Sequence, residues 1–144
     1  MDIEKSFGTK TENSSGGVKG NTVLLVDDND INRTITESIL NGCGVKVLIA
    51  VDGEQALEIF EESEEGTIAV IFMDVIMPKM DGLEATEKIR KLNRSDATLV
   101  PIIAMTGNDF EDDVLKAKEA GMNDYLPKPV KPSVLRSTLA KYLM

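Results

Sequence analysis

Apolar positions along this chain follow two patterns, short continuous runs and longer segments with apolar residues every three or four positions. The runs begin near residues 22, 45, 68, 99 and 124, and their lengths suit β-strands. A segment with helical spacing follows each run, and the first has Ile31, Ile35 and Ile39 at i, i+4 and i+8. Five strand–helix pairs in alternation predict an α/β protein with a parallel sheet covered on both faces.

The strand order can also be predicted. The second run, residues 45–49, contains the charged residue Lys46 and suits an edge of the sheet. Right-handed crossovers and short loops favour a flavodoxin-like, doubly wound, five-stranded sheet of order 2-1-3-4-5 with five helices. In that order the chain reverses direction between strands one and three, and ligands bind beyond the carboxyl ends of the strands at such a switch point.

The chain divides into a short tail and one domain. Residues 1–21 are polar, rich in Ser and Gly and poor in apolar anchors, which predicts a flexible tail or linker. Residues 22–144 have the length of a single domain.

Polar residues follow the apolar runs at the predicted carboxyl edge of the sheet. A single residue of this kind is usually a helix cap or a surface side chain, and Asp28 could cap the first helix. Several of them on one edge of one sheet indicate a functional site instead. They are Asp27 and Asp28 after the first run, Asp74 after the third, Thr106 after the fourth and Lys128 after the fifth.

These side chains suit a hard cation and a phosphoryl group. Three converging carboxylates repel one another, and a divalent cation relieves that repulsion. Oxygen ligands favour Mg²⁺, with Mn²⁺ as an alternative. Lys128 and Thr106 could stabilise phosphoryl oxygens, and a carboxylate nucleophile is already ionised and needs no general base.

Composition and charge exclude several classes of function. The chain has no histidine, so it holds neither a Ser-His-Asp triad nor an imidazole metal ligand. A phosphohistidine, or another phosphoryl donor, must come from another molecule. Its single cysteine, Cys43, cannot form an internal disulfide and is expected to be a small, at least partly buried filler.

The acidic charge belongs to the domain. Three acidic and three basic residues cancel within residues 1–21, so the net charge of −9 falls on residues 22–144. This argues against nucleic-acid binding, which needs a basic face. No apolar run reaches the roughly 20 residues that cross a bilayer, and the N-terminus lacks a signal-peptide pattern, so we expect a cytoplasmic protein with no membrane insertion.

Four motifs give the chain a family resemblance: VDDN at residues 26–29, MDVIMPKMDG at 73–82, AMTG at 104–107 and YLPKP at 125–129. Over residues 22–144 the chain resembles the receiver domains of two-component response regulators. The stretch around Asp74, with Asn29 and Asn32-Arg33, is most similar to receivers of hybrid sensor histidine kinases.

The resemblance implies a role for each motif residue. Asp74 is the expected phosphoacceptor, and the metal ligands are expected to be Asp27, Asp28, Asp74 and the backbone carbonyl of Ile76. Lys128 is expected to pair with Asp74 and then with the phosphoryl group.

The resemblance also implies a switch and a docking surface. Thr106 is expected to move toward the phosphoryl group and Tyr125 to turn inward. The Lys128–Pro129 bond is expected to be cis. The exposed start of the first helix, near Ile31 and Asn32, is the expected docking surface for a sensor histidine kinase or a histidine phosphotransfer protein.

Alternative functions remain open at this point. A phosphatase with an Asp nucleophile of the dehalogenase type needs a second acid two residues after the first, where this chain has Ile76. A vestigial receiver acting only as an interaction module is a second alternative. As a receiver, the chain would catalyse only its own phosphorylation and dephosphorylation, either free-standing or as part of a hybrid kinase.

Two positions in the resemblance bear on the lifetime of the phosphorylated state. They lie two residues after Asp74 and two after Thr106, and are Ile76 and Asn108 here. Ile76 cannot hold a hydrolytic water by hydrogen bonding, so slow self-dephosphorylation is expected.

Overall fold

The computed structural model describes residues 20–107 and 110–143. The predicted tail thus lies outside the described residues, apart from its last two positions, and so does Asn108. Within the described part, strands and helices alternate along the chain. The strands are β2 (Thr22–Val26), β3 (Lys46–Ala50), β4 (Ile68–Asp74), β5 (Ile102–Thr106) and β6 (Asp124–Pro127). The helices are α1 (Asp30–Gly42), α2 (Gly53–Glu62), α3 (Gly82–Arg90), α4 (Phe110–Ala120) and α5 (Pro132–Leu143).

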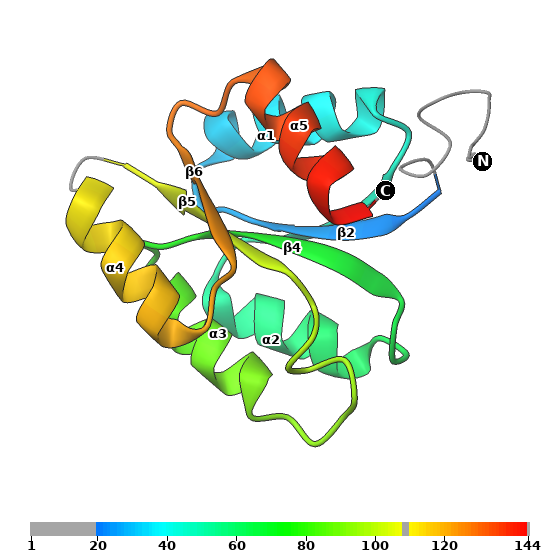
Figure 1. Cartoon of the computed structure of the whole chain (residues 1–144), viewed down its shortest axis with the longest axis vertical. Helices are drawn as coiled ribbons and strands as arrows, with labels where there is room; N and C mark the ends of the chain where they lie inside the picture. Colours follow the sequence, from blue (N-terminus) through cyan, green and yellow to red (C-terminus); the bar gives the residue numbers. More distant parts are fainter. Residues whose placement is uncertain (1–19, 108–109, 144) are drawn as a thin grey trace.

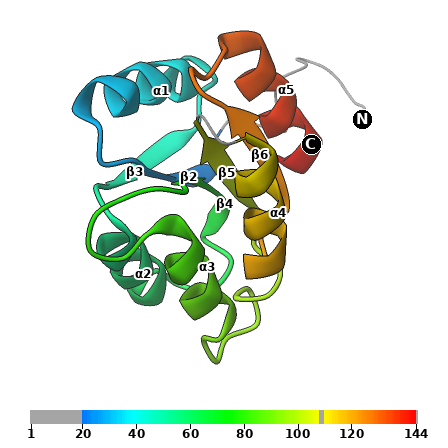
Figure 2. The ribbon, with the colours of Figure 1, turned by 90° about the vertical axis from the view of Figure 1, so that its left-hand side faces the viewer.

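The sheet confirms the predicted topology. Its strands lie in the order β3-β2-β4-β5-β6 and every neighbouring pair is parallel, which is the 2-1-3-4-5 order. Helices α1 and α5 cover one face, and α2, α3 and α4 cover the other (Figures 1 and 2). Strand β3 is an edge strand with Lys46 exposed, as its sequence predicts.

The core consists of two apolar clusters, one on each face of the sheet. Along β2, Leu24 and Val26 enter the cluster under α2 and α3, while Val23 and Leu25 enter the cluster under α1 and α5. Strand β4 is divided between the two clusters in the same way. Both faces of the central strands are buried, which explains why their sequences are continuous apolar runs and do not alternate. Cys43 is partly buried against the cluster under α1 and α5, as expected.

Helix α1 forms where the isoleucine spacing predicts it, but these isoleucines do not mark its buried face. Thr36 and Leu40 are the buried residues of α1, and Ile39 packs at the border of the core. Ile31 is 71% exposed and Ile35 is 52% exposed. The N-terminal half of α1 therefore presents apolar surface to solvent.

Strand β5 begins at Ile102, three residues later than the apolar run at residue 99 suggests. The backbone groups of Val100 form hydrogen bonds outside the sheet. Its N–H donates to the Asp96 carbonyl, and its carbonyl accepts from Arg90 Nη1 at 2.8 Å. Val100 is buried without joining the sheet, so its hydrophobicity reflects packing and not strand pairing.

Candidate functional site

The predicted acidic residues meet at the carboxyl edge of the sheet. Asp27 directly follows β2, and Asp74 ends β4, which pairs with β2. One carboxylate oxygen each from Asp27, Asp28 and Asp74 can be chosen so that all lie within 4.8 Å of one another. Asp27 and Asp74 are buried and Asp28 is exposed, so the cluster runs from the protein interior to solvent.

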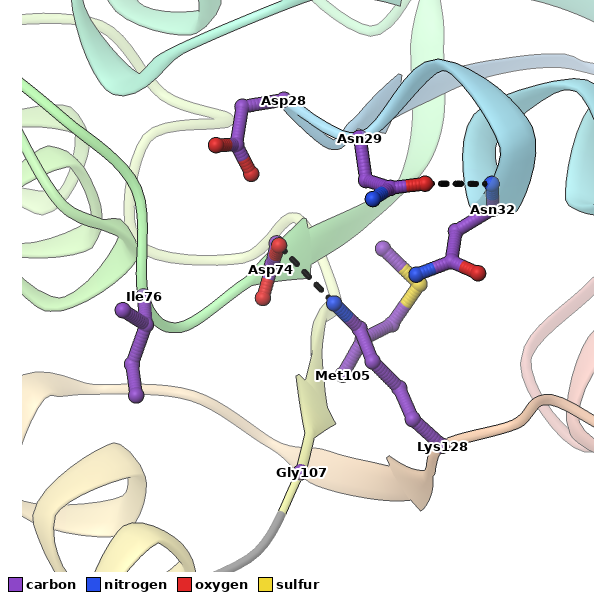
Figure 3. A pocket seen from close by; sticks show the side chains of 8 residues that line it. All are labelled: Asp28, Asn29, Asn32, Asp74, Ile76, Met105, Gly107 and Lys128. Carbon is purple, nitrogen blue, oxygen red and sulfur yellow. Dashed lines mark hydrogen bonds and ion pairs between the residues drawn. The ribbon is translucent and has the colours of Figure 1, made fainter.

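The turn between β2 and α1 leaves Asp28 available to the site. The Asn29 N–H donates to Asp27 Oδ1 at 2.9 Å, and the Asn29 side chain caps α1 by accepting from the Asn32 N–H at 2.9 Å. Asn29 therefore takes the capping role that Asp28 could have filled, and the Asp28 carboxylate points toward Asp74 (Figure 3). Arg33 secures the turn, because its Nη1 donates to the Asp27 carbonyl at 2.9 Å.

Lys128 brings a positive charge to the two buried carboxylates. Its Nζ lies 2.9 Å from Asp74 Oδ2 and 3.8 Å from Asp27 Oδ2. The backbone N–H of Lys128 donates to the Thr106 carbonyl at 2.7 Å, which holds Lys128 at the end of β5. The Lys128–Pro129 peptide bond is cis, as expected.

The environment of Asp74 favours its protonated form more than water does. Burial raises the pKa of Asp74 to about 6, the hydrogen bond and charge of Lys128 act in the opposite direction, and the charge of Asp27 adds to the rise. At neutral pH the carboxylate form predominates, but it is held at a cost that a further cation would relieve.

Thr106 lies at the end of β5 beside this cluster. Its side chain is fully buried, and its hydroxyl has no hydrogen-bond partner among the described residues. A buried hydroxyl without a partner is uncommon and costs free energy. Tyr125 lies on β6, where it pairs with Ala104 of β5, and is 40% exposed. The exchange of position between Thr106 and Tyr125 stays a prediction.

A cleft of about 400 Å³ opens over these residues. The Ile76 side chain, which points away from Asp74 in Figure 3, is hydrocarbon, so only the backbone carbonyl of this residue is a candidate metal ligand. The residues that line the cleft are Asp28, Asn29, Asn32, Asp74, Ile76, Met105, Gly107 and Lys128. Asp27 lies behind this lining, next to a smaller cavity that Lys128 also borders.

The residues present fit a hard divalent cation. The donor atoms are carboxylate oxygens, which Mg²⁺ prefers, and an open cleft leaves room for the waters that Mg²⁺ retains. Burial, and to a lesser degree the charge of Asp27, raises the pKa of Asp74, and a bound cation would oppose both effects. The same edge holds the Asp74 carboxylate, the Lys128 ammonium and the Thr106 hydroxyl, which lacks a partner within the described part of the chain.

A doubly wound sheet with its polar side chains at this edge defines an α/β protein built around a switch-point site. Comparison with known proteins identifies the family: the chain belongs to the response regulator receiver domain family, whose model matches residues 23–140.

Three similar proteins illustrate the relationship. Hybrid signal transduction histidine kinase I of Dictyostelium discoideum is 35% identical over 143 residues, covering 90% of this chain and 8% of the kinase. The receiver domain of sensor histidine kinase PA1611 from Pseudomonas aeruginosa, with a magnesium ion coordinated in its active site cleft, has a TM-score of 0.78 and 38% identity, covering 86% of this chain and 98% of that chain. The co-crystal of the Saccharomyces cerevisiae histidine phosphotransfer protein Ypd1 with the receiver domain of Ssk1 gives a TM-score of 0.75 and 31% identity, covering 87% of this chain and 90% of that chain.

The chain thus spans 8% of the length of the Dictyostelium kinase. Across the part of the chain that the structure describes, no helix combines the length and the apolar character needed to cross a bilayer.

Proposed function

We propose that residues 22–144 form a phosphorelay receiver that accepts a phosphoryl group from a partner's phosphohistidine onto Asp74, and that residues 1–21 are a tail or linker. The proposal depends above all on one observation: three carboxylates gather at the switch point, with Lys128 Nζ 2.9 Å from Asp74 Oδ2. Membership of the receiver family and the similarity to a hybrid histidine kinase support it.

The proposed transfer is a direct displacement at phosphorus. Asp74, ionised at neutral pH, forms the new O–P bond as the N–P bond of the phosphohistidine breaks, and the leaving imidazole keeps the electron pair and takes up a proton. Lys128 neutralises charge on the phosphoryl oxygens. No side chain of this chain needs to act as a general base, which agrees with the absence of histidine.

The proposed metal is Mg²⁺, held by Asp28, Asp74 and the Ile76 carbonyl, with Asp27 binding directly or through water. The magnesium ion in the cleft of the similar PA1611 receiver supports this assignment. When bound, the ion supplies positive charge that offsets the acidic cluster and the incoming phosphoryl oxygens. Mn²⁺ accepts the same oxygen ligands, so we expect it to substitute.

The proposed conformational switch begins at Thr106. An aspartyl phosphate carries more negative charge than a carboxylate and three acceptor oxygens. The Thr106 hydroxyl, which lacks a partner among the described residues, would gain one by donating to a phosphoryl oxygen. Its movement would open space for Tyr125 to turn inward from its partly exposed position.

The proposed partner is a sensor histidine kinase or a histidine phosphotransfer protein that docks at the start of α1. Ile31 is exposed there, and Asn32 lines the cleft, so a docked partner lies next to Asp74. The co-crystal of Ypd1 with a receiver of 31% identity supports a histidine phosphotransfer protein as the partner. The net charge of −9 argues against nucleic acid as a partner.

One experiment separates this function from the alternatives. The chain is incubated with acetyl phosphate and Mg²⁺ and followed by intact mass spectrometry. A single phosphoryl adduct that is absent from Asp74→Asn supports the receiver. Steady turnover of p-nitrophenyl phosphate would favour a phosphatase, and no adduct under any donor would favour a vestigial interaction module.

A further inference from the structure

The loop between β4 and α3, residues 75–81, carries the Ile76 carbonyl that the proposed function assigns to the metal. Two backbone hydrogen bonds close its base: the Val75 N–H donates to the Met105 carbonyl at 3.2 Å, and the Gly82 N–H donates to the Val75 carbonyl at 2.9 Å. The contact at Gly82 is close, because a Cβ there would lie 2.1 Å from the Asp74 carbonyl oxygen. The first bond therefore fixes the start of the loop to β5, and the second joins the two ends of the loop to each other.

The far side of the loop is held by the N-terminus of α2. The Gly53 N–H, at the first residue of α2, donates to the Met80 carbonyl at 3.0 Å. A Cβ on Gly53 would lie 2.4 Å from the Met80 oxygen and 3.0 Å from the Asp81 oxygen, so glycine is needed for this approach. The first N–H groups of a helix have no partner within it, and the loop carbonyl satisfies one of them.

Local contacts also hold the two segments that this hydrogen bond joins, the start of α2 and the loop. Asp52 is buried and caps α2 by accepting from the Gln55 N–H at 2.9 Å, and Gln55 Oε1 accepts from the Val51 N–H at 3.0 Å. On the loop side, Lys79 has φ of 65°, a left-handed conformation that is uncommon outside glycine. The Lys79 ammonium lies 3.9 Å from Asp52 Oδ2.

We propose that Gly53 is a positioning residue for the metal site, acting through the Met80 carbonyl. The bond from Gly53 fixes the course of the loop between Ile76 and α3, so the Ile76 carbonyl is already oriented before a metal binds. Groups that hydrogen-bond to metal ligands orient them, and their loss weakens metal binding about 10- to 100-fold. Gly53 acts one step further out, through the loop that carries the ligand. This inference rests on the proposed function, because it assumes that the Ile76 carbonyl is a ligand.

The first test compares Mg²⁺ affinity by isothermal titration calorimetry in Gly53→Ala and wild type. We expect about tenfold weaker binding in the variant, at the lower end of what loss of an outer-shell support costs. Gly42→Ala is the matched glycine control, because a Cβ at Gly42 meets nothing within 4 Å. Ser63→Ala controls for a weaker α2, since it removes the bond from Ser63 Oγ to the Phe60 carbonyl at the opposite end of that helix.

A second test needs no variant and therefore holds even if Gly53→Ala does not fold. Hydrogen exchange of the Gly53 amide is measured by NMR in wild-type protein with and without Mg²⁺. If the bond to Met80 and the metal support the same loop conformation, Mg²⁺ must slow exchange of the Gly53 amide, because such coupling is reciprocal. The Gly20 amide, which donates to the Gly44 carbonyl away from the loop, is the internal reference.

The outcomes separate this inference from the proposed function. Weaker Mg²⁺ binding in Gly53→Ala alone among the three variants, together with slower exchange of the Gly53 amide when Mg²⁺ is present, supports the positioning role of Gly53. If Gly53→Ala binds Mg²⁺ as tightly as wild type, even with a lowered melting temperature, the positioning role of Gly53 is overturned and the proposed function still stands. Wild-type protein that binds no Mg²⁺ overturns both.

Discussion

Lys128 Nζ lies 2.9 Å from Asp74 Oδ2, closer than its 3.8 Å to Asp27 Oδ2. The ammonium thus sits nearest to the carboxylate proposed to react. It opposes the effect of burial on the pKa of Asp74, which nonetheless rises to about 6. This pair balances two requirements, a buried nucleophile and an ionised one.

We predict that Lys128→Met raises the pKa of Asp74 further and slows phosphorylation by acetyl phosphate about 100-fold, as loss of one preorganised electrostatic contact does elsewhere. NMR titration of the Asp74 carboxyl reports the first effect and intact mass spectrometry over time reports the second. Lys131→Met is the control, because Lys131 is exposed three residues away. A phosphorylation rate equal to wild type would remove Lys128 from the mechanism.

The sequence predicts the site better than it predicts the supports of the fold. Asp74, Thr106 and Lys128 follow apolar runs, and the rules for parallel sheets place such residues on one edge. Arg90 and Arg94 have no such pattern. Their guanidinium groups donate to backbone carbonyls, of Gly121 and Phe60 for example, that only the folded chain brings near. Hydrophobic periodicity also identifies α1 without saying which of its apolar residues are buried, and the exposure of its start near Ile31 was expected only from the family resemblance.

Arg94 and Asp96 form a well-packed ion pair at the opposite end of the sheet from the acidic site. Their side chains are 10% and 12% exposed, and Arg94 Nε lies 2.6 Å from Asp96 Oδ1. The hydrogen bond from Arg94 lowers the pKa of Asp96 against the effect of burial, and the Gly66 amide adds to the decrease. The Asp96 carboxylate therefore binds a proton more weakly in the folded state than in the unfolded state.

The sign of the linkage gives a pH-dependent prediction. A carboxyl group with a lowered folded pKa stabilises the fold above its unfolded pKa, about 4, and this contribution is lost as the pH falls through the folded value. We expect Asp96→Asn to cost about 2 kcal/mol at neutral pH, typical of a hydrogen bond to a charged group. The gap in unfolding free energy between wild type and variant should narrow below about pH 4. Urea titrations at several pH values measure it, and a gap that stays constant would contradict the assignment.

The exposed isoleucine of α1 gives a prediction about the partner. Ile31→Ser should slow phosphotransfer from a phosphorylated histidine phosphotransfer protein about tenfold, because a buried apolar anchor at an interface is worth at least 1.4 kcal/mol. Phosphorylation by acetyl phosphate, which needs no docking surface, should not change. Leu99→Ser is the matched control, since Leu99 is 74% exposed near the start of β5, away from the cleft. Equal losses from both donors would show that Ile31 affects the site and not docking.

The position of Ile76 leads to a prediction about how long the phosphorylated state lasts. Its side chain is 71% exposed at the rim of the cleft and has no group that can hold a water by hydrogen bonding. An asparagine there could orient a water toward the phosphoryl group. If it contributes one hydrogen bond in the transition state, about 1.4 kcal/mol, then Ile76→Asn should shorten the lifetime of the aspartyl phosphate about tenfold.

Decay of the aspartyl phosphate after removal of acetyl phosphate is followed by intact mass spectrometry, with Ile76→Leu as the apolar control. Because the proposed metal contact uses the Ile76 carbonyl, both variants should keep the Mg²⁺ affinity of wild type, and a lifetime in Ile76→Asn equal to or longer than that of wild type would refute the hypothesis.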